Sequence, residues 1–198
     1  MSRLMALILL LALPAVAAAA PTPPALTDDE QASLEAGKMV VRTGIDDIPW
    51  KTMGVIDIDA TKAKTWKAIL DFDARLAENK PAKSFETYSD VVQGPERIIS
   101  TRWDLKVLGS DIVYSLHYHY NEADSYLYYV LDETKENDLV RCDGSYQVVD
   151  SPVIEGGCRF IYIVDTDSGR KIPESLRVTL AKSGLKDMLE AIKKRAEG

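Results

Sequence analysis

The 198-residue sequence has only two cysteines and two histidines, and its 24 Lys and Arg residues are outnumbered by 31 Asp and Glu. So few cysteines exclude a disulfide-dense miniprotein. The net charge is −7, and the longest basic block is Lys193-Lys194-Arg195. An acidic chain of this kind is a poor partner for phosphate backbones and anionic lipid surfaces. We therefore expect no nucleic-acid partner.

Motifs that would define a reaction are also missing. The sequence contains neither a G-x-S-x-G nucleophile elbow nor a glycine-rich phosphate loop. His117 and His119 have the i, i+2 spacing at which two imidazoles on one strand can share a metal, but a third ligand would have to be acidic. Three acidic pairs fall at predicted strand ends and turns, where solvated carboxylates are common: Asp57/Asp59, Asp71/Asp73 and Asp165/Asp167. We expect no metal, no cofactor and no catalytic residue, which favours a binding protein over an enzyme.

A long apolar run occurs only at the N-terminus. Arg3 precedes the run Leu4–Leu13, and an alanine stretch ends at Ala20, just before Pro21. This is the pattern of a secretory signal peptide with a small-residue cleavage site. A membrane anchor is the alternative, but the apolar segment is at the lower limit of the roughly 17 to 25 residues that span a bilayer. We expect residues 1–20 to be cleaved and the product to be periplasmic or secreted.

Export affects the interpretation of Cys142 and Cys158. In an oxidising compartment, a cysteine pair is more often a disulfide than a redox or metal site. The sequence therefore predicts a disulfide between these two residues, and two buried free thiols are the alternative.

Residues 21–49 are predicted to form a linker with one short helix, and residues 50–198 the folded domain. The linker helix begins at the capping-box pattern Thr27-Asp28-Asp29-Glu30 and ends near Gly37. In the domain, apolar residues recur either at every second position, as in strands, or about every 3.6 positions, as in helices. The predicted elements are a strand over 53–58, short helices over 61–70 and 71–78, strands over 84–92, 97–107, 112–120, 125–132, 139–149 and 157–165, and a long helix from Pro173 to the C-terminus.

Turn positions in a meander fix which residues of neighbouring strands face each other, and the two-residue repeat carries that facing across the sheet. A turn centred between Glu122 and Ala123 places Tyr118 opposite Leu127, and a turn centred on Asp150 pairs the two cysteines. The predicted apolar face comprises Ile99, Thr101, Trp103, Leu105, Val107, Tyr114, Leu116, Tyr118, Leu127, Tyr129, Leu131, Val140, Cys142, Gly144, Tyr146, Val148, Phe160, Tyr162 and Val164. The opposite face, predicted to be exposed to solvent, comprises Ser115, His117, His119, Arg141, Asp143, Ser145, Gln147, Arg159 and Asp165.

An antiparallel sheet with one apolar face and one long amphipathic helix to cover it is an α+β arrangement. The many tyrosines on that face favour a partly hydrated or ligand-filled cavity, because buried phenols need hydrogen-bond partners. A dry core with tyrosine tips at its rim is the alternative. The helical pattern turns Gly184 inward, where it would leave room for a ligand or simply allow close packing. The predicted cavity residues are Ile99, Trp103, Tyr114, Leu116, Tyr118, Tyr129, Tyr146, Phe160, Tyr162, Leu185, Met188, Leu189 and Ile192.

The segment Gly54–Asp71 resembles the first strand, small-residue turn and tryptophan-bearing helix of START-like or Bet v 1-like proteins. This superfamily, also called SRPBCC, includes polyketide cyclase/dehydrase and lipid-transport domains. Gly157–Tyr162, Ile172-Pro173 and the long helix are similar to its last strand and grip helix, and the order of elements matches from about Trp50 to Ala196. The resemblance implies a helix-grip fold. This fold would have a curved seven-stranded antiparallel sheet, two short helices after strand 1, and a long C-terminal helix over the sheet.

The same resemblance implies that a cavity between sheet and helix holds a hydrophobic small molecule such as a lipid, sterol, isoprenoid or polyketide. We therefore expect an exported, monomeric binding or transfer protein that contacts membranes only transiently. One alternative is an enzyme of the cyclase or aromatase type, in which Arg102, Tyr118 or Tyr146 polarises a bound polyketide. Another is a protein-interaction module with a collapsed core.

Overall fold

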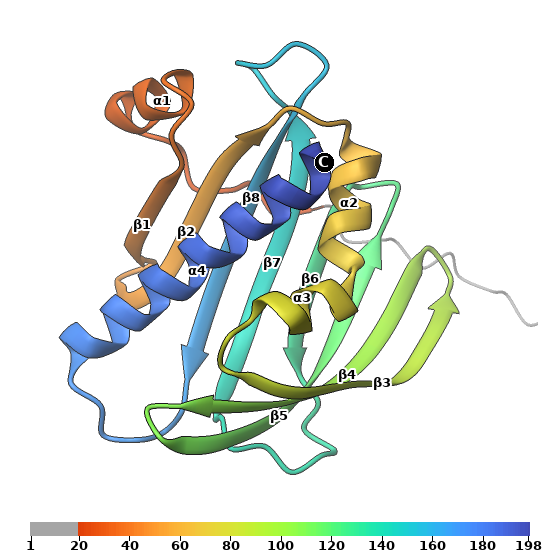
Figure 1. Cartoon of the computed structure of the whole chain (residues 1–198), viewed down its shortest axis with the longest axis vertical. Helices are drawn as coiled ribbons and strands as arrows, with labels where there is room; N and C mark the ends of the chain where they lie inside the picture. Colours follow the sequence, from red (N-terminus) through yellow and green to blue (C-terminus); the bar gives the residue numbers. More distant parts are fainter. Residues whose placement is uncertain (1–19) are drawn as a thin grey trace, which may run out of the picture.

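The computed structural model describes residues 20–198, and it contains one antiparallel sheet with three helices against one of its faces (Figure 1). The signal-peptide prediction concerns residues 1–20, all of which except Ala20 lie outside the described residues. In chain order the elements are α1 (Asp28–Glu35), β1 (Val40–Ile45), β2 (Ile48–Ile58), α2 (Lys62–Leu70), α3 (Phe72–Glu78), β3 (Ala82–Gln93), β4 (Glu96–Val107), β5 (Ser110–Asn121), β6 (Tyr126–Leu131), β7 (Arg141–Asp150), β8 (Cys158–Asp167) and α4 (Glu174–Glu197).

The sheet combines a meander with one long-range pairing. Its strand order is β1-β2-β8-β7-β6-β5-β4-β3, and neighbouring strands are antiparallel. The described residues form eight strands and four helices, so the expected seven strands were one too few. The additional strand is β1, in the segment expected to be a linker. The turn that joins β1 to β2 has Asp46 and Asp47 in the left-handed region (φ 53° and 61°) instead of the Asn-Gly pair that marks such hairpins in a sequence.

Capping side chains determine where the first three helices begin. Thr27 and Glu30 form the expected capping box of α1. Thr61 caps α2, and Asp71 caps α3. The long helix α4 follows Pro173, and at about 1.5 Å per residue it extends roughly 36 Å.

The division of the meander strands into two faces is confirmed, although their register differs from the prediction. Tyr118 lies opposite Tyr129 rather than Leu127, a shift of two residues. In the β7–β8 hairpin Cys142 lies opposite Thr166, which is eight residues beyond the expected partner. An even shift leaves every side chain on its original face. Val140 is an exception: it precedes β7 and is 67% exposed.

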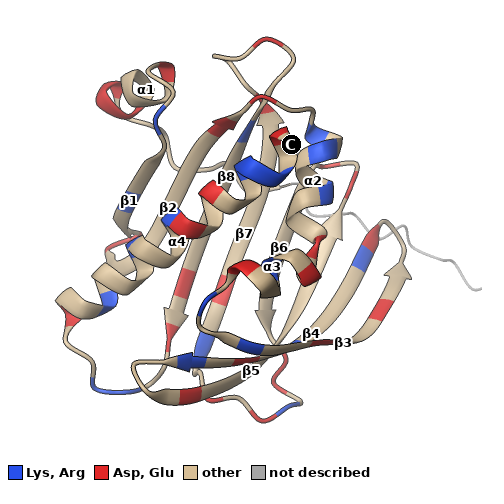
Figure 2. Ribbon diagram, in the orientation of Figure 1, with Lys and Arg blue, Asp and Glu red and all other residues tan. Residues whose placement is uncertain are grey.

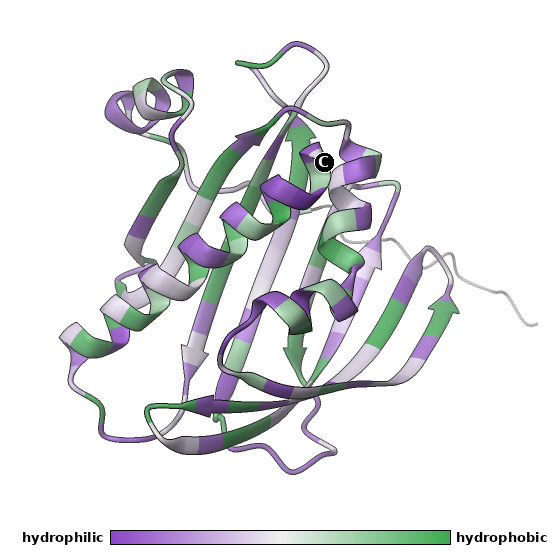
Figure 3. Cartoon of the chain, viewed as in Figure 1, coloured by the Kyte–Doolittle hydropathy of each residue, from purple (hydrophilic) through white to green (hydrophobic). Residues whose placement is uncertain are grey.

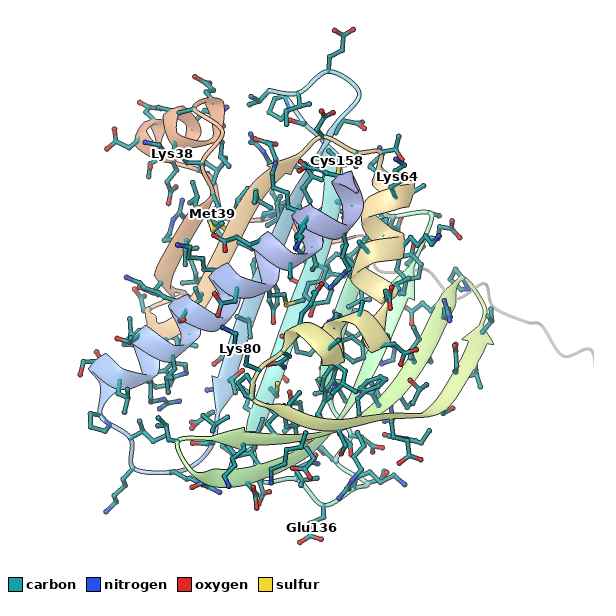
Figure 4. All side chains as sticks on the ribbon, viewed as in Figure 1. Lys38, Met39, Lys64, Lys80, Glu136 and Cys158 are labelled. Carbon is teal, nitrogen blue, oxygen red and sulfur yellow. The ribbon has the colours of Figure 1, made fainter. Side chains whose placement is uncertain are left out.

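The disulfide prediction is wrong, because both cysteines are free and buried. Residues 151–157 form a loop in place of the tight turn expected at Asp150, and Ser151 N donates to Gly157 O at 3.1 Å across it. This loop brings Cys158 opposite Asp150, at the far end of β7 from Cys142. Cys158 lies at the start of β8 (Figure 4), with its Sγ 3.0 Å from Thr65 Oγ1 of α2.

The opposite face of the sheet is less exposed than the strand alternation predicts. Arg159 and Asp57 are both buried and form a bidentate ion pair, with N–O distances of 3.0 and 2.8 Å. Gln31 of α1 accepts a further hydrogen bond from Arg159. Ser115 is also buried, and its backbone N–H donates to Asn137 in the loop before β7. Helix α1 and this loop therefore cover polar residues that we expected to face solvent, Asp57 included.

Helix α4 crosses the apolar face of the sheet (Figure 1), but it has buried residues only from Leu185 onwards. Figure 2 shows acidic and basic residues interspersed along the helix, and Figure 3 shows hydrophobic segments on the strands that it crosses. Its buried residues are Leu185, Leu189, Ile192 and Ala196. Leu176 and Leu180 of the predicted stripe are 37% and 36% exposed.

Two glycines show how α4 sits on the sheet. A Cβ added to Gly54 of β2 would lie 2.6 Å from Leu189 Cδ1, so the absence of a side chain there lets α4 approach β2 closely. Gly184, in contrast, is exposed, and apart from the adjoining backbone of α4 nothing lies within 4 Å of the position of an added Cβ. The expectation that Gly184 faces inward is therefore wrong. Within residues 20–198, no helix combines the length and the apolar character needed to cross a bilayer.

Candidate functional site

The residues expected to line a cavity belong to one cluster on the inner face of the sheet. Strands β4 to β8 present nine of them at alternate positions, so that these side chains project to the same side, and α4 contributes the other four. Ile99, Trp103, Leu116, Tyr118, Tyr129, Tyr146, Phe160, Tyr162, Leu185, Leu189 and Ile192 are buried, and the partly buried Tyr114 and Met188 pack against them. The structure thus brings these residues together, and their contact with a ligand stays a prediction.

The tyrosines of this cluster form a continuous series of ring contacts. The ring centres of Tyr118 and Tyr129 are 5.3 Å apart, those of Tyr129 and Tyr146 5.6 Å, and those of Tyr146 and Tyr162 4.6 Å. The hydroxyl oxygens of Tyr129 and Tyr162 are 2.8 Å apart and share a hydrogen bond. These are the separations of packed aromatic pairs. Burial raises the pKa of all four phenols above the ordinary value, so they are neutral at physiological pH.

Helix α3 covers this aromatic wall with two side chains from the same helix face. Phe72 is buried, with its ring centre 5.1 Å from that of Tyr118. Arg75 follows one turn later and directs its guanidinium at the rings. The guanidinium carbon lies 5.0 Å from the ring centre of Phe72, and 5.8, 5.8 and 5.9 Å from those of Trp103, Tyr118 and Tyr146. All four distances are within the range of about 6 Å for cation–π contact.

Arg75 has no acidic partner among the residues that the structure describes. Its Nη2 is 3.4 Å from the hydroxyl oxygen of Tyr146, and its Nη1 is buried without a hydrogen-bond partner there. Arginine does not lose its proton at physiological pH, so the guanidinium keeps its charge. Trp103 Nε1 and Thr101 Oγ1, on the inner face of β4, are also buried without partners in the described chain. Arg75 is half-buried, and its guanidinium therefore has one shielded nitrogen without a partner, while the inner face of β4 adds two unpaired polar groups.

Sequence reasoning missed Arg75 and pointed to Arg102 instead. Arg102 is exposed, because it follows Thr101 and precedes Trp103 in β4 and so faces away from the cluster. The spacing of Phe72 and Arg75 was the signal that could have placed both residues on one face of a helix. That spacing does not say which surface the face packs against.

A hollow of 210 Å³ lies between α3 and the β3–β4 hairpin. Phe72, Phe85 and Ile99 form its apolar wall, and Asp71 and Asp73 contribute carboxylates to its rim. The Phe72 ring also contacts the Arg75 guanidinium, so this one side chain separates the hollow from the buried charge.

A second hollow, of 630 Å³, lies on the opposite face of the sheet, and His117 and Asp132 are among its lining residues. His117 Nδ1 is 2.9 Å from Ser100 Oγ, and His117 Nε2 is 3.4 Å from Asp132 Oδ1. The hydroxyl of Tyr88 donates to the other oxygen of Asp132 at 2.6 Å. A Ser–His–Asp order suggests nucleophilic catalysis. However, Ser100 is only 4% exposed and does not line the hollow, so the network satisfies buried polar groups instead.

The two histidines do not converge on one metal position. Their ring centres are 6.4 Å apart, and His119 Nδ1 is 3.2 Å from a carboxylate oxygen of Glu96. Residues 20–198 contain no group of three His, Cys, Asp or Glu side chains placed to hold a metal.

Asp165, expected to be solvated, is buried, and Trp50 Nε1 donates to its carboxylate at 3.1 Å.

Comparison with known proteins identifies the fold. No protein-family model matches the sequence, and no curated protein matches it. Among solved structures, the STAR-related lipid transfer protein from Xanthomonas axonopodis is similar at a TM-score of 0.62 and 16% identity, over 81% of this chain and 93% of that one. A START superfamily protein from Mycobacterium smegmatis has a TM-score of 0.58 at 16% identity, over 80% and 97% of the two chains. The Zhui aromatase/cyclase from Streptomyces sp. R1128 has a TM-score of 0.56 at 12% identity, over 80% and 94%.

Proposed function

We propose that this protein, which has the START-like fold, is an exported binding and transfer protein for a hydrophobic small molecule such as a lipid, a sterol or an isoprenoid. The observation that carries the proposal is the aromatic cluster itself, which holds unpaired polar groups beneath the small helix α3. A dry core would leave those groups without partners, whereas a bound ligand or water can supply them. The signal-peptide pattern of residues 1–20 supports export.

The apolar wall can provide enough free energy to hold a hydrophobic ligand out of water. Covering about 300 Å² of apolar ligand surface, at about 25 cal/mol per Å², contributes roughly 7 kcal/mol before the cost of association. The rings are closely packed in this structure, so a ligand needs a way in. The hollow beside Phe72 provides that route, because moving Phe72 joins the hollow to the cluster.

A second candidate function is catalysis of the cyclase or aromatase type. It is favoured by the structural similarity to an aromatase/cyclase and by the position of Tyr118 and Tyr146 beside the Arg75 charge. A phenol next to a guanidinium can polarise a carbonyl oxygen. Export argues against this function, since polyketide substrates are built in the cytoplasm.

Expression of the full chain in a Gram-negative host tests export and binding together. The intact mass of protein from the periplasmic fraction reports whether the chain begins at Pro21. Organic extraction of natively purified protein, followed by mass spectrometry, reports any co-purified hydrophobic molecule. Recovery of such a molecule supports the proposal. No ligand from several hosts, together with no binding of the neutral fluorescent probe N-phenyl-1-naphthylamine, would instead support a protein-interaction module.

Paired variants locate the bound molecule. Ile99→Trp places a large ring in the hollow on the inner face and should weaken probe binding by at least tenfold. Ile98→Trp is the matched control, because Ile98 is the preceding residue in β4 and points to the opposite face. Equal probe affinity in both variants would place the binding site elsewhere. Turnover of an aromatic trial substrate that is lost in Tyr118→Phe, but kept in the outer-face variant Tyr128→Phe, would establish the enzyme alternative.

A further inference from the structure

We infer that the ligand carries a single negative charge, borne by a carboxylate or a phosphodiester, and that Arg75 binds this charged end inside the aromatic cluster. The inference rests on the proposed function and makes it more specific. It names the chemical class of the ligand and the residue that selects it.

The first argument is the half-buried charge of Arg75, which has no acidic partner in the described chain. An ionised group removed from water is strongly destabilised unless an opposite charge or several hydrogen bonds replace its hydration. Arg75 Nη1 is buried without a partner in the described chain, and Nη2 has only the long contact to Tyr146. Arginine does not escape the penalty by deprotonation at physiological pH. The aromatic rings provide part of the compensation, but each cation–π contact is weaker than an ion pair.

The second argument excludes the neighbouring phenols as counter-ions. Tyr118, Tyr129, Tyr146 and Tyr162 surround the guanidinium, and burial raises the pKa of each one. Neutral phenols can donate or accept hydrogen bonds, but they carry no charge. The phenols therefore supply no negative charge to balance Arg75, and an anionic ligand group can supply it.

The third argument concerns the shape and the number of charges. A guanidinium presents its N–H groups as a planar fork that matches the two oxygens of a carboxylate or of a phosphodiester. The free Nη1 of Arg75 supplies one donor, and Trp103 Nε1 is a second unpaired donor on the neighbouring strand face. One positive charge balances one negative charge, which excludes a dianionic phosphate monoester as the best fit. The remaining, apolar part of the ligand packs on the aromatic wall.

Competition against the neutral probe tests the inference with three ligands of matched chain length. These are hexadecanoate and methyl hexadecyl phosphate, each used below its critical micelle concentration, and hexadecan-1-ol, used below its solubility limit. In the wild-type protein, we expect at least one of the two anions to compete roughly ten- to a hundredfold better than the alcohol, as one charge-assisted interaction predicts. The better anion identifies the carboxylate or the phosphodiester as the preferred group.

Arg75→Met should abolish the preference for anions, so that neither anion competes better than hexadecan-1-ol. Arg170→Met is the matched control, since Arg170 is exposed in the segment before α4 and its loss changes the net charge equally. If Arg75→Met does not fold, as judged by circular dichroism, Arg75→Lys replaces it. Lysine keeps the charge but not the fork, and it should reduce the anion preference without abolishing it.

The outcomes separate the inference from the proposed function. Probe binding with equal competition by all three ligands, or with no competition, would overturn the inference while leaving a hydrophobic site in place. An anion preference that is unchanged in Arg75→Met, or equally reduced in Arg170→Met, would also overturn it. Failure of the probe to bind the wild-type protein at all would refute the proposed function itself.

Discussion

The position of Gly144 in β7 yields a quantitative prediction about the aromatic cluster. A Cβ added there would lie 2.3 Å from Tyr129 Oη, 2.4 Å from Cζ and 2.6 Å from Cε1. The ring of Tyr129 cannot move aside easily, because it is packed between Tyr118 and Tyr146 and its hydroxyl bonds to Tyr162. Gly144 is therefore the reason that this ring can lie flat across the neighbouring strand.

Gly144→Ala should destabilise the protein through the displacement of this one ring. Over-packing of a buried site costs about 1 to 3 kcal/mol, and loss of the Tyr129–Tyr162 hydrogen bond costs about 1 kcal/mol more. The free energy of unfolding should thus fall by roughly 2 to 4 kcal/mol, which lowers the melting temperature of a domain of this size by about 5 to 15 °C. Urea denaturation followed by tryptophan fluorescence and by circular dichroism measures the change.

A double-mutant cycle tests the cause of that loss. Tyr129→Leu removes the three ring atoms that the methyl group introduced by Gly144→Ala would meet, so adding Gly144→Ala to Tyr129→Leu should cost less than about 0.5 kcal/mol more. The same cost for the alanine substitution in both backgrounds would refute the reasoning. So would a single Gly144→Ala variant as stable as the wild type.

Three further predictions address other parts of the structure. Cys142 and Cys158 should be unreactive towards Ellman's reagent in the folded protein and yield two thiols in urea without a reductant, because both are free and burial raises the pKa of Cys142 to about 12; a disulfide would yield none. Burial raises the pKa of Asp132, but hydrogen bonds from Thr134 and Tyr88 outweigh this effect and lower the pKa to about 2. Since the folded pKa is below the unfolded value of about 3.9, the contribution of Asp132 is complete above about pH 5 and declines as the pH falls through 2; it amounts to about 2 kcal/mol, and pH-dependent urea denaturation of Asp132→Asn should lack this decline. Gly184→Ala should raise the free energy of unfolding by about 1 kcal/mol, as for an exposed helical glycine, and destabilisation in thermal melts would show that the position is packed.

The elements and the faces of the meander could be predicted from the sequence because both depend on local periodicity. The inner and outer positions of β4 to β8 alternate with the two-residue pleat, so Trp103, Tyr118 and Tyr146 were correctly placed on one face. The capping box at Thr27 is likewise a local signal. These assignments survive errors in register, provided that each error is an even number of residues.

The relative position of the two cysteines, which rules out a disulfide, could not be predicted in the same way. It depended on the geometry of the connection between β7 and β8, where a loop over residues 151–157 replaces a turn at Asp150. Strand β1 was missed for a related reason, because its hairpin uses two aspartates in place of the usual turn residues. Loop geometry depends on contacts with the rest of the fold, and the two-residue repeat contains no information about it.

What the sequence determined by itself was therefore a set of amphipathic segments and the aromatic composition of their apolar side. Only the tertiary structure decided that α3 places the Arg75 guanidinium against that aromatic side without an acidic partner in the described chain, and that Gly184 faces solvent. The physical reason is that periodicity records which face of a segment is buried, whereas charge compensation depends on groups that are distant along the chain. Arg75 and Tyr146 are 71 residues apart, and only the folded sheet brings them together.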